Sequence, residues 1–208
     1  MSNKSPNVSV IIPTYNRGYC IKRCINSVIN QTFKNFELII VDNYSSDNTF
    51  NLISGFDDAR IKYFLFKNNN IIAKSRNYGL SKANGKYIAF LDSDDWWKSQ
   101  KLEHSINELD AGFDLVYHDL IIKNEAFRIE HKIRNFSWQL KKPIMQNLIL
   151  DGSPISTSAV LVRTSLMKKI NGFSEDPKLV GSEDYDAWIR CSMFSNAFKY
   201  LNKDLGYY

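Results

Sequence analysis

The first half of the chain alternates short apolar runs with segments of helical periodicity, and this alternation constrains the fold more than any other feature of the sequence. The apolar runs are rich in β-branched side chains, which is typical of buried strands. The expected strands span residues 8–12, 36–41, 61–66 and 86–91. The expected helices span residues 21–29, 47–54 and 71–83. Strands and helices that alternate at this length favour a mostly parallel sheet with helices on both faces.

Local signals define where these elements end. Pro13 lacks a backbone N–H, so the first strand is expected to end there. Asn84 and Gly85 are expected to cap the helix of residues 71–83, because glycine readily adopts the left-handed conformation of a C-cap. The apolar face of the first helix comprises Ile21, Cys24, Ile25, Val28 and Ile29. This spacing predicts an amphipathic helix that packs on the sheet.

The second half of the chain is less regular. Helices are expected over residues 99–109 and 182–193, and strands over residues 114–117 and 156–162. Residues 123–142 match neither pattern and carry six Lys or Arg against two Glu, a local surplus of four positive charges. Since no internal repeat or Gly/Ser-rich linker divides the chain, a single domain is expected.

The composition excludes several classes of protein. With 208 residues, of which 44% are hydrophobic and 24% charged, the chain resembles an ordinary soluble globular protein. Cys20, Cys24 and Cys191 are odd in number and form no CxxC pair, which predicts reduced thiols and neither a disulfide scaffold nor a zinc site. The N-terminus lacks the apolar region of a signal peptide, and no apolar run reaches membrane-spanning length. We therefore expect a cytoplasmic protein.

Polar clusters follow three of the expected strands at the point where each strand ends. They occupy residues 13–16, 42–47 and 92–95. In open α/β sheets, ligands bind outside the carboxyl ends of the strands. The three clusters are therefore expected to meet at one rim and to form a binding site.

The third cluster, Asp92-Ser93-Asp94-Asp95, is the most acidic. Carboxylates at the end of an apolar strand need water, a donor network or a cation, because an unpaired buried charge is costly. One interpretation is a solvated turn. The other is a divalent cation on Asp92 or Asp94, since Mg²⁺ and Mn²⁺ favour oxygen ligands and often take only one or two carboxylates. The first strand is followed by no GxGxxG or GxxxxGK[ST] loop, so a cation would have to hold the phosphates of a nucleotide.

Five segments carry a resemblance to a known family. They are VSVIIPTYNR (8–17), INQTF (29–33), FELIIVDN (36–43), SRNYGLSKANGKYIAFLDSDDWW (75–97) and INGFSEDPKLVGSEDYDAWIR (170–190). Together, over nearly the whole chain and in the family's order, they resemble family 2 of the glycosyltransferases, which have the GT-A fold. The resemblance implies an α/β, Rossmann-like domain with a mostly parallel central sheet flanked by helices.

The resemblance also implies two halves and a reaction. Residues 1–97 would bind the nucleotide sugar, and residues 98–208 would bind the acceptor. Relatives of this kind usually continue past the position of Tyr208, so the acceptor half is expected to be incomplete. The implied activity is the inverting transfer of a sugar from a uridine diphosphate sugar (UDP-sugar) to an acceptor hydroxyl.

Carried over residue by residue, the resemblance implies a nucleotide pocket. Its members would be Pro13, Thr14, Tyr15, Asp42, Asn43, Arg76, Asp92 and Ser93. Tyr15 would lie along the base, Asp42 and Asn43 would contact the uracil and ribose, Arg76 would lie beside the base or the diphosphate, and Asp92 would approach the ribose. The family often has two Asp where this chain has Asp42-Asn43, but an amide can still donate to a base carbonyl. Asp94 would ligate Mn²⁺ or Mg²⁺.

Glu183 and Asp184 follow Ser182, an expected N-cap, and therefore lie in the first turn of a predicted helix. The helix dipole alone favours acids there. Displacement with inversion also needs a base on the face opposite the leaving diphosphate. The resemblance places that base at Asp184, with Glu183 positioning the acceptor or orienting the loop, whereas Asp186 is expected to be a solvated helix residue.

The acceptor is expected to be a saccharide or a lipid-linked glycan of surface polysaccharide synthesis, with no nucleic acid as a partner. Trp97 is expected to face it, although Trp96 and Trp97 could equally be packing residues. His118 could approach the metal or be simply hydrogen-bonded. The basic surplus of residues 123–142 predicts peripheral contact with the cytoplasmic face of the inner membrane, the alternative being a solvated face. A non-catalytic nucleotide-sugar-binding module remains the second hypothesis.

Overall fold

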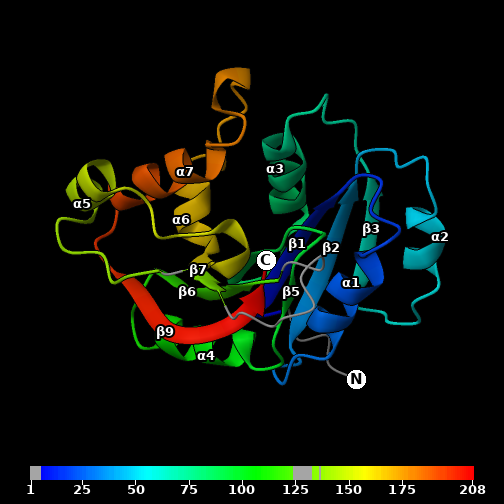
Figure 1. Cartoon of the computed structure of the whole chain (residues 1–208), viewed down its shortest axis with the longest axis horizontal. Helices are drawn as coiled ribbons and strands as arrows, with labels where there is room; N and C mark the ends of the chain where they lie inside the picture. The colour runs from blue at the N-terminus through cyan, green and yellow to red at the C-terminus, as the bar shows by residue number, and fades with distance from the viewer. Residues whose placement is uncertain (1–5, 124–132, 136) are drawn as a thin grey trace.

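The residues that the computed structural model describes, 6–123, 133–135 and 137–208, place nine strands in one sheet (Figure 1). The strand order is β3-β2-β1-β4-β8-β6-β9-β5, and β7 pairs with β6. The strands are β1 (Val8–Thr14), β2 (Phe36–Asp42), β3 (Ile61–Leu65), β4 (Tyr87–Phe90), β5 (Trp96–Trp97), β6 (Leu115–Ile122), β7 (Ile133–Asn135), β8 (Leu161–Arg163) and β9 (Phe198–Tyr207). The helices are α1 (Ile21–Ile29), α2 (Thr49–Ser54), α3 (Ile72–Lys82), α4 (Lys101–Asp110), α5 (Ile144–Asp151), α6 (Thr164–Lys169) and α7 (Glu183–Ser192).

Strand pairing differs between the two halves of the sheet. β3, β2, β1 and β4 are parallel to one another. β8 is antiparallel to both β4 and β6, whereas β9 is parallel to β6 and antiparallel to β5. The expected α/β fold, with a central parallel sheet flanked by helices, is confirmed.

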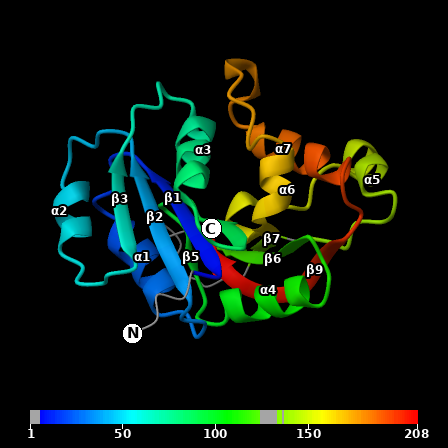
Figure 2. The same ribbon diagram turned by 180° about the vertical axis from the view of Figure 1, so that it is seen from behind.

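Both faces of the sheet are buried. Ile11 and Ile39 point to one face, where they pack with α3, α5, α6 and α7. Ile12 and Leu38 point to the other face, where they pack with α1, α2 and α4. Figures 1 and 2 show α1 and α4 on one side of the sheet and α3, α6 and α7 on the other. Because successive side chains of a strand point to opposite faces, burial on both faces explains the continuous apolar runs.

The first strand continues through Pro13 to Thr14, so the prediction that it ends at Pro13 is wrong. In β1 the carbonyls of Asn7 and Ile11 accept hydrogen bonds from Tyr87 and Leu91, on the β4 side. Pro13 lies two positions after Ile11 along the strand, so its backbone faces the same side. β4, however, ends at Phe90. No ladder hydrogen bond is lost, which is why proline is tolerated in this central strand.

The prediction of a glycine C-cap after α3 is also wrong. The helix ends at Lys82, and the backbone of its C-cap residue, Ala83, is extended, with φ −74° and ψ 132°. Gly85 is needed for a different reason, since a β carbon there would lie 2.5 Å from the backbone nitrogen of Ser9. Its own N–H donates to the Ser9 hydroxyl at 2.9 Å, which fixes the entry into β4.

The second half departs further from the predicted elements. Residues 156–162 form a 3₁₀ turn, Thr157–Ala159, followed by β8, instead of one strand. β5 and β9 carry no clear local pattern, yet they pair through Trp96 with Tyr207 and Trp97 with Gly206. Half of the basic segment 123–142 that lacks a predicted element, namely 124–132 and 136, lies outside the described residues. None of the helices in the described part of the chain is long and apolar enough to cross a membrane.

Candidate active site

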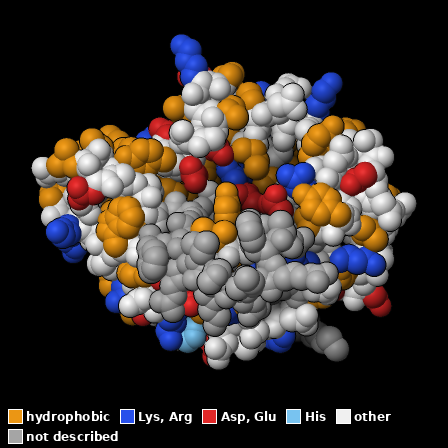
Figure 3. All heavy atoms as spheres, viewed as in Figure 1, with side chains coloured by type: hydrophobic (Ala, Val, Ile, Leu, Met, Phe, Trp, Pro, Cys, Tyr) orange, Lys and Arg blue, Asp and Glu red, His pale blue; other side chains and the backbone are white. Residues whose placement is uncertain are grey.

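A cleft of about 760 Å³ opens at the carboxyl ends of β1, β2 and β4. Figure 3 shows acidic and basic side chains meeting near the centre of this face. Six of the eight predicted nucleotide-pocket residues line the cleft: Pro13, Thr14, Tyr15, Asn43, Asp92 and Ser93. Asp94 lines it as well. The polar clusters that follow three separate strands therefore do meet at one rim.

Asp42 lies below the cleft instead of lining it. Its Oδ1 accepts hydrogen bonds from the backbone and hydroxyl of Ser45, at 2.9 and 2.7 Å, and its Oδ2 accepts one from the Tyr63 hydroxyl at 2.7 Å. Burial and this contact with Asp42 raise the pKa of Tyr63. Because both carboxylate oxygens are already bonded, Asp42 shapes the loop after β2, and its neighbour Asn43 faces the cleft.

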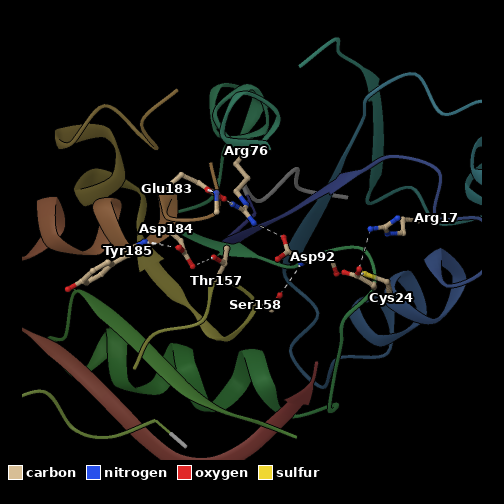
Figure 4. A network of polar contacts seen from close by, with 11 residues as sticks. Arg17, Cys24, Arg76, Asp92, Thr157, Ser158, Glu183, Asp184 and Tyr185 are labelled. Atoms are coloured by element: carbon tan, nitrogen blue, oxygen red, sulfur yellow. Dashed lines mark hydrogen bonds and ion pairs between the residues drawn. The ribbon is translucent and has the colours of Figure 1, made fainter. Parts of the chain in front are cut away.

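Arg76 is buried, with 3% of its surface exposed, and it lies between two acids (Figure 4). Its Nη2 is 2.7 Å from Oδ1 of Asp92, and its Nη1 is 2.7 Å from Oε1 of Glu183. Burial alone would lower the pKa of Arg76, but the two carboxylates raise it, so the guanidinium stays charged. The structure therefore places Arg76 as a link between α3, the end of β4 and α7, and not on the cleft wall.

Glu183 is as fully engaged as Asp42. Its Oε2 accepts a hydrogen bond from the Gly181 backbone at 2.7 Å, while its Oε1 pairs with Arg76. Only 6% of its surface is exposed. Glu183 therefore fixes the start of α7, and it lines neither the cleft nor the cavity that holds Asp184.

The acidic turn after β4 is held from two sides. The Asp92 backbone N–H donates to the Ser158 hydroxyl at 3.1 Å, and the Cys24 thiol lies 3.6 Å from the Asp92 carbonyl. Arg23 donates to the Asp94 carbonyl at 3.2 Å. These contacts to the backbone leave the Asp94 side chain half exposed in the cleft, where its Oδ2 lies 3.4 Å from Nη2 of Arg17.

Asp94 fits the role of a metal ligand. Its carboxylate is an accessible oxygen ligand that, among the described residues, forms an ion pair with the partly exposed Arg17. Within the described residues no group of three or more His, Cys, Asp or Glu could hold a metal by itself. Mg²⁺ and Mn²⁺ do not require such a group, because they bind through one or two carboxylates together with substrate phosphates. The next acid, Asp95, is enclosed, and burial raises its pKa to about 7.

Asp184 lines a second, adjoining cavity of about 400 Å³. Its Oδ2 accepts a hydrogen bond from the Thr157 hydroxyl at 2.9 Å, and its Oδ1 accepts one from the Tyr185 backbone at 2.7 Å. Burial raises the pKa of Asp184. The residue after Thr157, Ser158, accepts the hydrogen bond from Asp92. The 3₁₀ turn Thr157–Ala159 therefore contacts both Asp184 and the acidic turn.

The start of α7 differs from the prediction in two details. Ser182 precedes the helix, but its side chain makes no capping hydrogen bond, and its carbonyl accepts the Asp186 N–H at 3.1 Å. Asp186 is not simply solvated, since its Oδ2 pairs with Nη2 of Arg190 one turn later, at 2.6 Å.

The structure does not bring Trp97 to either the cleft or the second cavity. Its side chain is 4% exposed, lies in the core and donates from Nε1 to the Ser158 carbonyl at 2.7 Å. Trp96 lines the cleft instead, stacked on Tyr207 with ring centroids 4.8 Å apart and covered by Arg23 at 3.6 Å. Alternation along β5 sends the two rings to opposite sides.

His118 is enclosed in the core, away from the cleft. Its Nδ1 lies 2.8 Å from the Asp119 carbonyl, and burial lowers its pKa to about 3. The hydrogen-bonded structural interpretation of His118 therefore fits the structure, and an approach to the metal does not.

Several cleft and cavity residues escape the sequence reasoning. Arg17 could have been found, because it ends the polar cluster directly after β1. Thr157 and Ser158 lie in a strand-like apolar stretch that folds as a 3₁₀ turn, so no local signal identifies them. Trp138 lines the second cavity from a segment in which no element was predicted.

Comparisons with known proteins agree with this geometry. The family model described as glycosyl transferase family 2 matches residues 9–171. An Escherichia coli protein, UDP-Glc:alpha-D-GlcNAc-diphosphoundecaprenol beta-1,3-glucosyltransferase WfgD, is 36% identical over 88% of this chain and 68% of its own length. An uncharacterized glycosyltransferase of Rickettsia typhi is 31% identical over 93% of this chain, which spans 61% of that relative.

A solved structure gives the same result. Residues 1–349 of S. aureus TarS, in complex with UDP-GlcNAc, superpose with a TM-score of 0.80 at 25% identity, covering 97% of this chain and 58% of that one. The GT-A-like fold thus extends over almost the whole chain, although the chain spans only part of each relative. From the family match, the relatives and the fold together, the chain belongs to the family 2 glycosyltransferases.

Proposed function

We propose that this chain transfers a sugar, with inversion, from a UDP-sugar to a hydroxyl of a saccharide acceptor. The observation that carries the proposal is the connection between two acids from different halves: Asp94 in the cleft and Asp184 in the adjoining cavity. The Arg76 ion pairs and the turn at Thr157 and Ser158 connect the acidic turn, which carries Asp94, with the start of α7, which carries Asp184. Such an arrangement offers one site for the leaving diphosphate and another for the attacking hydroxyl.

The cleft would hold the uridine diphosphate. Pro13, Thr14, Tyr15, Asn43, Asp92 and Ser93 form its walls. Tyr15 is 50% exposed and free to lie along a base. Two similar proteins support this assignment. The name of the relative WfgD includes a UDP-glucose donor, and TarS was solved with UDP-GlcNAc. Asp42 and Arg76 act indirectly. Asp42 fixes the loop after β2, and Arg76 fixes the position of Asp92.

Asp94 would hold Mn²⁺ or Mg²⁺. A divalent cation supplies Lewis-acid stabilisation of the charge that grows on a departing diphosphate. Arg17, at 3.4 Å from Asp94, and Arg23, which holds the Asp94 carbonyl, place further positive charge at the same end of the cleft. These side chains orient the diphosphate and leave the carboxylate of Asp94 accessible.

Asp184 would remove the proton from the acceptor hydroxyl. The Thr157 hydroxyl and the Tyr185 N–H fix its two oxygens, and burial raises its pKa, which makes it a better proton acceptor than an exposed Asp. Glu183 is a positioning residue in this scheme, since its carboxylate is occupied by Arg76 and Gly181. The acceptor-binding role expected of Glu183 is therefore not retained.

The acceptor would be a lipid-linked saccharide of surface polysaccharide synthesis, by analogy with the diphosphoundecaprenol acceptor in the name of WfgD. Such an acceptor implies work at the cytoplasmic face of the inner membrane, with the protein attached peripherally, and no role for nucleic acid.

The test is product analysis. The chain is incubated with Mn²⁺, a panel of UDP-sugars and a panel of lipid-linked saccharides, and the products are identified by mass spectrometry. An acceptor that gains one sugar, with release of UDP, is the expected result. A UDP-sugar that binds but is recovered unchanged with every acceptor would support the non-catalytic binding module, and the absence of any UDP-sugar binding would refute both.

A further inference from the structure

The cavity beside Asp184 has a lining of its own. It is formed by the loop of residues 153–156, the start of α7 and Trp138, and it shares no lining residue with the cleft among the described residues. Its volume of about 400 Å³ lies near the lower end of the range of small-molecule sites, roughly 300–1,000 Å³. It is therefore large enough for a sugar ring, and it holds the group that would act as base.

The described wall of the cavity carries an aromatic ring, hydroxyl groups and a carboxylate. Trp138 supplies an aromatic surface that is 40% exposed, and the serines at 153, 156 and 182 supply hydroxyl groups. Among the described lining residues the only charged side chain is Asp184, and none is Lys, Arg or His. The cleft differs, since cations line it together with acids: Arg17, Arg23 and Lys123 with Asp92, Asp94 and Asp95.

The aromatic surface is held in place by its backbone. The Tyr117 hydroxyl donates to the Trp138 carbonyl at 2.6 Å and accepts the Leu140 N–H at 3.2 Å. The preceding Ser137 hydroxyl donates to the Pro154 carbonyl at 2.8 Å, which ties the Trp138 segment to the loop on the opposite wall. A fixed aromatic surface loses little conformational freedom when a ligand packs on it.

We infer that this cavity binds the terminal sugar of the acceptor on Trp138, and that the sugar must be uncharged. The inference rests on the proposed function, because it takes Asp184 as the group that the acceptor hydroxyl must reach. The C–H face of a sugar ring is apolar and packs on an indole, while its hydroxyls suit the serines. A sugar carboxylate would meet the Asp184 carboxylate, and Arg76, the described cation that acts on Asp184, is already paired with Asp92 and Glu183, so the cavity presents a repulsive element to anionic sugars.

Three matched probes test the inference: methyl β-glucoside, methyl β-N-acetylglucosaminide and methyl β-glucuronide. Their dissociation constants are measured by saturation-transfer NMR with the chain saturated by UDP and Mn²⁺, and UDP affinity is measured separately by calorimetry. The two neutral glycosides should bind roughly tenfold or more tightly than the glucuronide. Asp184→Asn, which removes the charge and keeps the size, should abolish that discrimination.

Variants at Trp138 complete the test. Trp138→Ala should weaken the neutral glycosides about tenfold, and Trp138→Phe, which keeps an aromatic face, should recover most of the loss. Leu150→Ala, an exposed apolar change on α5 outside the cavity, is the control and should change nothing. UDP affinity should stay unchanged in all of these variants.

The outcomes distinguish a failure of the cavity assignment from a failure of the proposed function. If UDP binds but the glucuronide binds as well as the glucosides, or if no glycoside binds at tens of millimolar, the neutral-sugar cavity is wrong and the proposed donor site stands. If Trp138→Ala leaves the neutral glycosides unaffected, the role of Trp138 is wrong. If UDP itself does not bind, the proposed function fails first.

Discussion

The cleft and the second cavity are built in different ways. The cleft collects residues that directly follow β1, β2 and β4, three neighbouring parallel strands. The cavity collects Trp138, the 153–156 loop and the start of α7, which belong to no repeating unit. Charge differs too, since among the described residues both signs line the cleft, whereas the one charged side chain of the cavity wall is an acid. The comparison teaches that one rim of a parallel sheet can hold a donor by its topology, while the acceptor side depends on contacts between distant segments.

The largest expected effect comes from Arg76, which joins the two regions. Arg76→Met should lower the free energy of unfolding by about 3–5 kcal/mol, because it leaves the buried Glu183 and the partly buried Asp92 without their partner. Denaturant titration measures this change. Lys86→Met, which breaks an exposed pair with Asp110, is the control and should cost at most about 1 kcal/mol. Equal losses in the two variants would mean that Arg76 does not hold the regions together.

Asp184→Asn should separate the regions functionally. Transfer should fall by roughly a hundredfold or more, the usual contribution of a positioned base, while UDP affinity in the cleft should stay the same. Turnover and calorimetry on the same variant measure both effects. Asp186→Asn, the same change on the same helix, is the control because Asp186 faces Arg190 and not the cavity. Turnover that survives in Asp184→Asn would make Asp184 structural and return attention to a binding module.

Asp94→Asn should act on the cleft alone. Mn²⁺ should strengthen UDP binding to the unmodified chain, and the variant should lose most of that gain, roughly tenfold or more. Calorimetry of UDP with Mn²⁺ and with excess chelator measures the difference. Asp57→Asn, an exposed acid remote from the cleft, should behave like the unmodified chain. A gain from Mn²⁺ that persists in Asp94→Asn would place the metal elsewhere.

The smallest effect concerns pH and the cavity. Because the pKa of Asp184 is raised in the folded chain, the fold binds its proton more tightly than the unfolded chain does. Its contribution to stability is therefore greatest at low pH and is lost as pH rises from the ordinary Asp value of 3.8 through the raised pKa. Relative to the unmodified chain, Asp184→Asn should gain melting temperature as the pH is raised through the range that begins at the ordinary Asp value of 3.8. A constant difference across that range would contradict a raised pKa.

Sequence reasoning reached the cleft more readily than the cavity for a physical reason. Residues such as Thr14, Asn43 and Asp92 follow strands whose apolar runs are evident, and parallel topology then brings the strand ends together. The roles of Arg76 and Glu183 were not accessible in this way, because each is set by an ion pair between α3 and α7 that no local pattern encodes.

The errors have the same origin. Trp97 was expected at the acceptor because the sequence cannot say which of two adjacent tryptophans points inward, and only the pairing of β5 with β9 decides it. The strand predicted over residues 156–162 fails because the apolar pattern is shared by a buried 3₁₀ turn, whose Thr157 and Ser158 hydroxyls serve as hydrogen-bond partners.

The pairing of β5 with β9 also bears on how the chain is made. Trp96 follows the acidic turn immediately, yet its strand partner Tyr207 lies in the last strand that the structure describes. On the ribosome, β1 to β4 emerge and can pair with one another long before β9 exists. The wall of the cleft formed by Trp96 must wait for β9, so competence to bind a nucleotide should be acquired only after β9 has emerged and not when the parallel half of the sheet first folds.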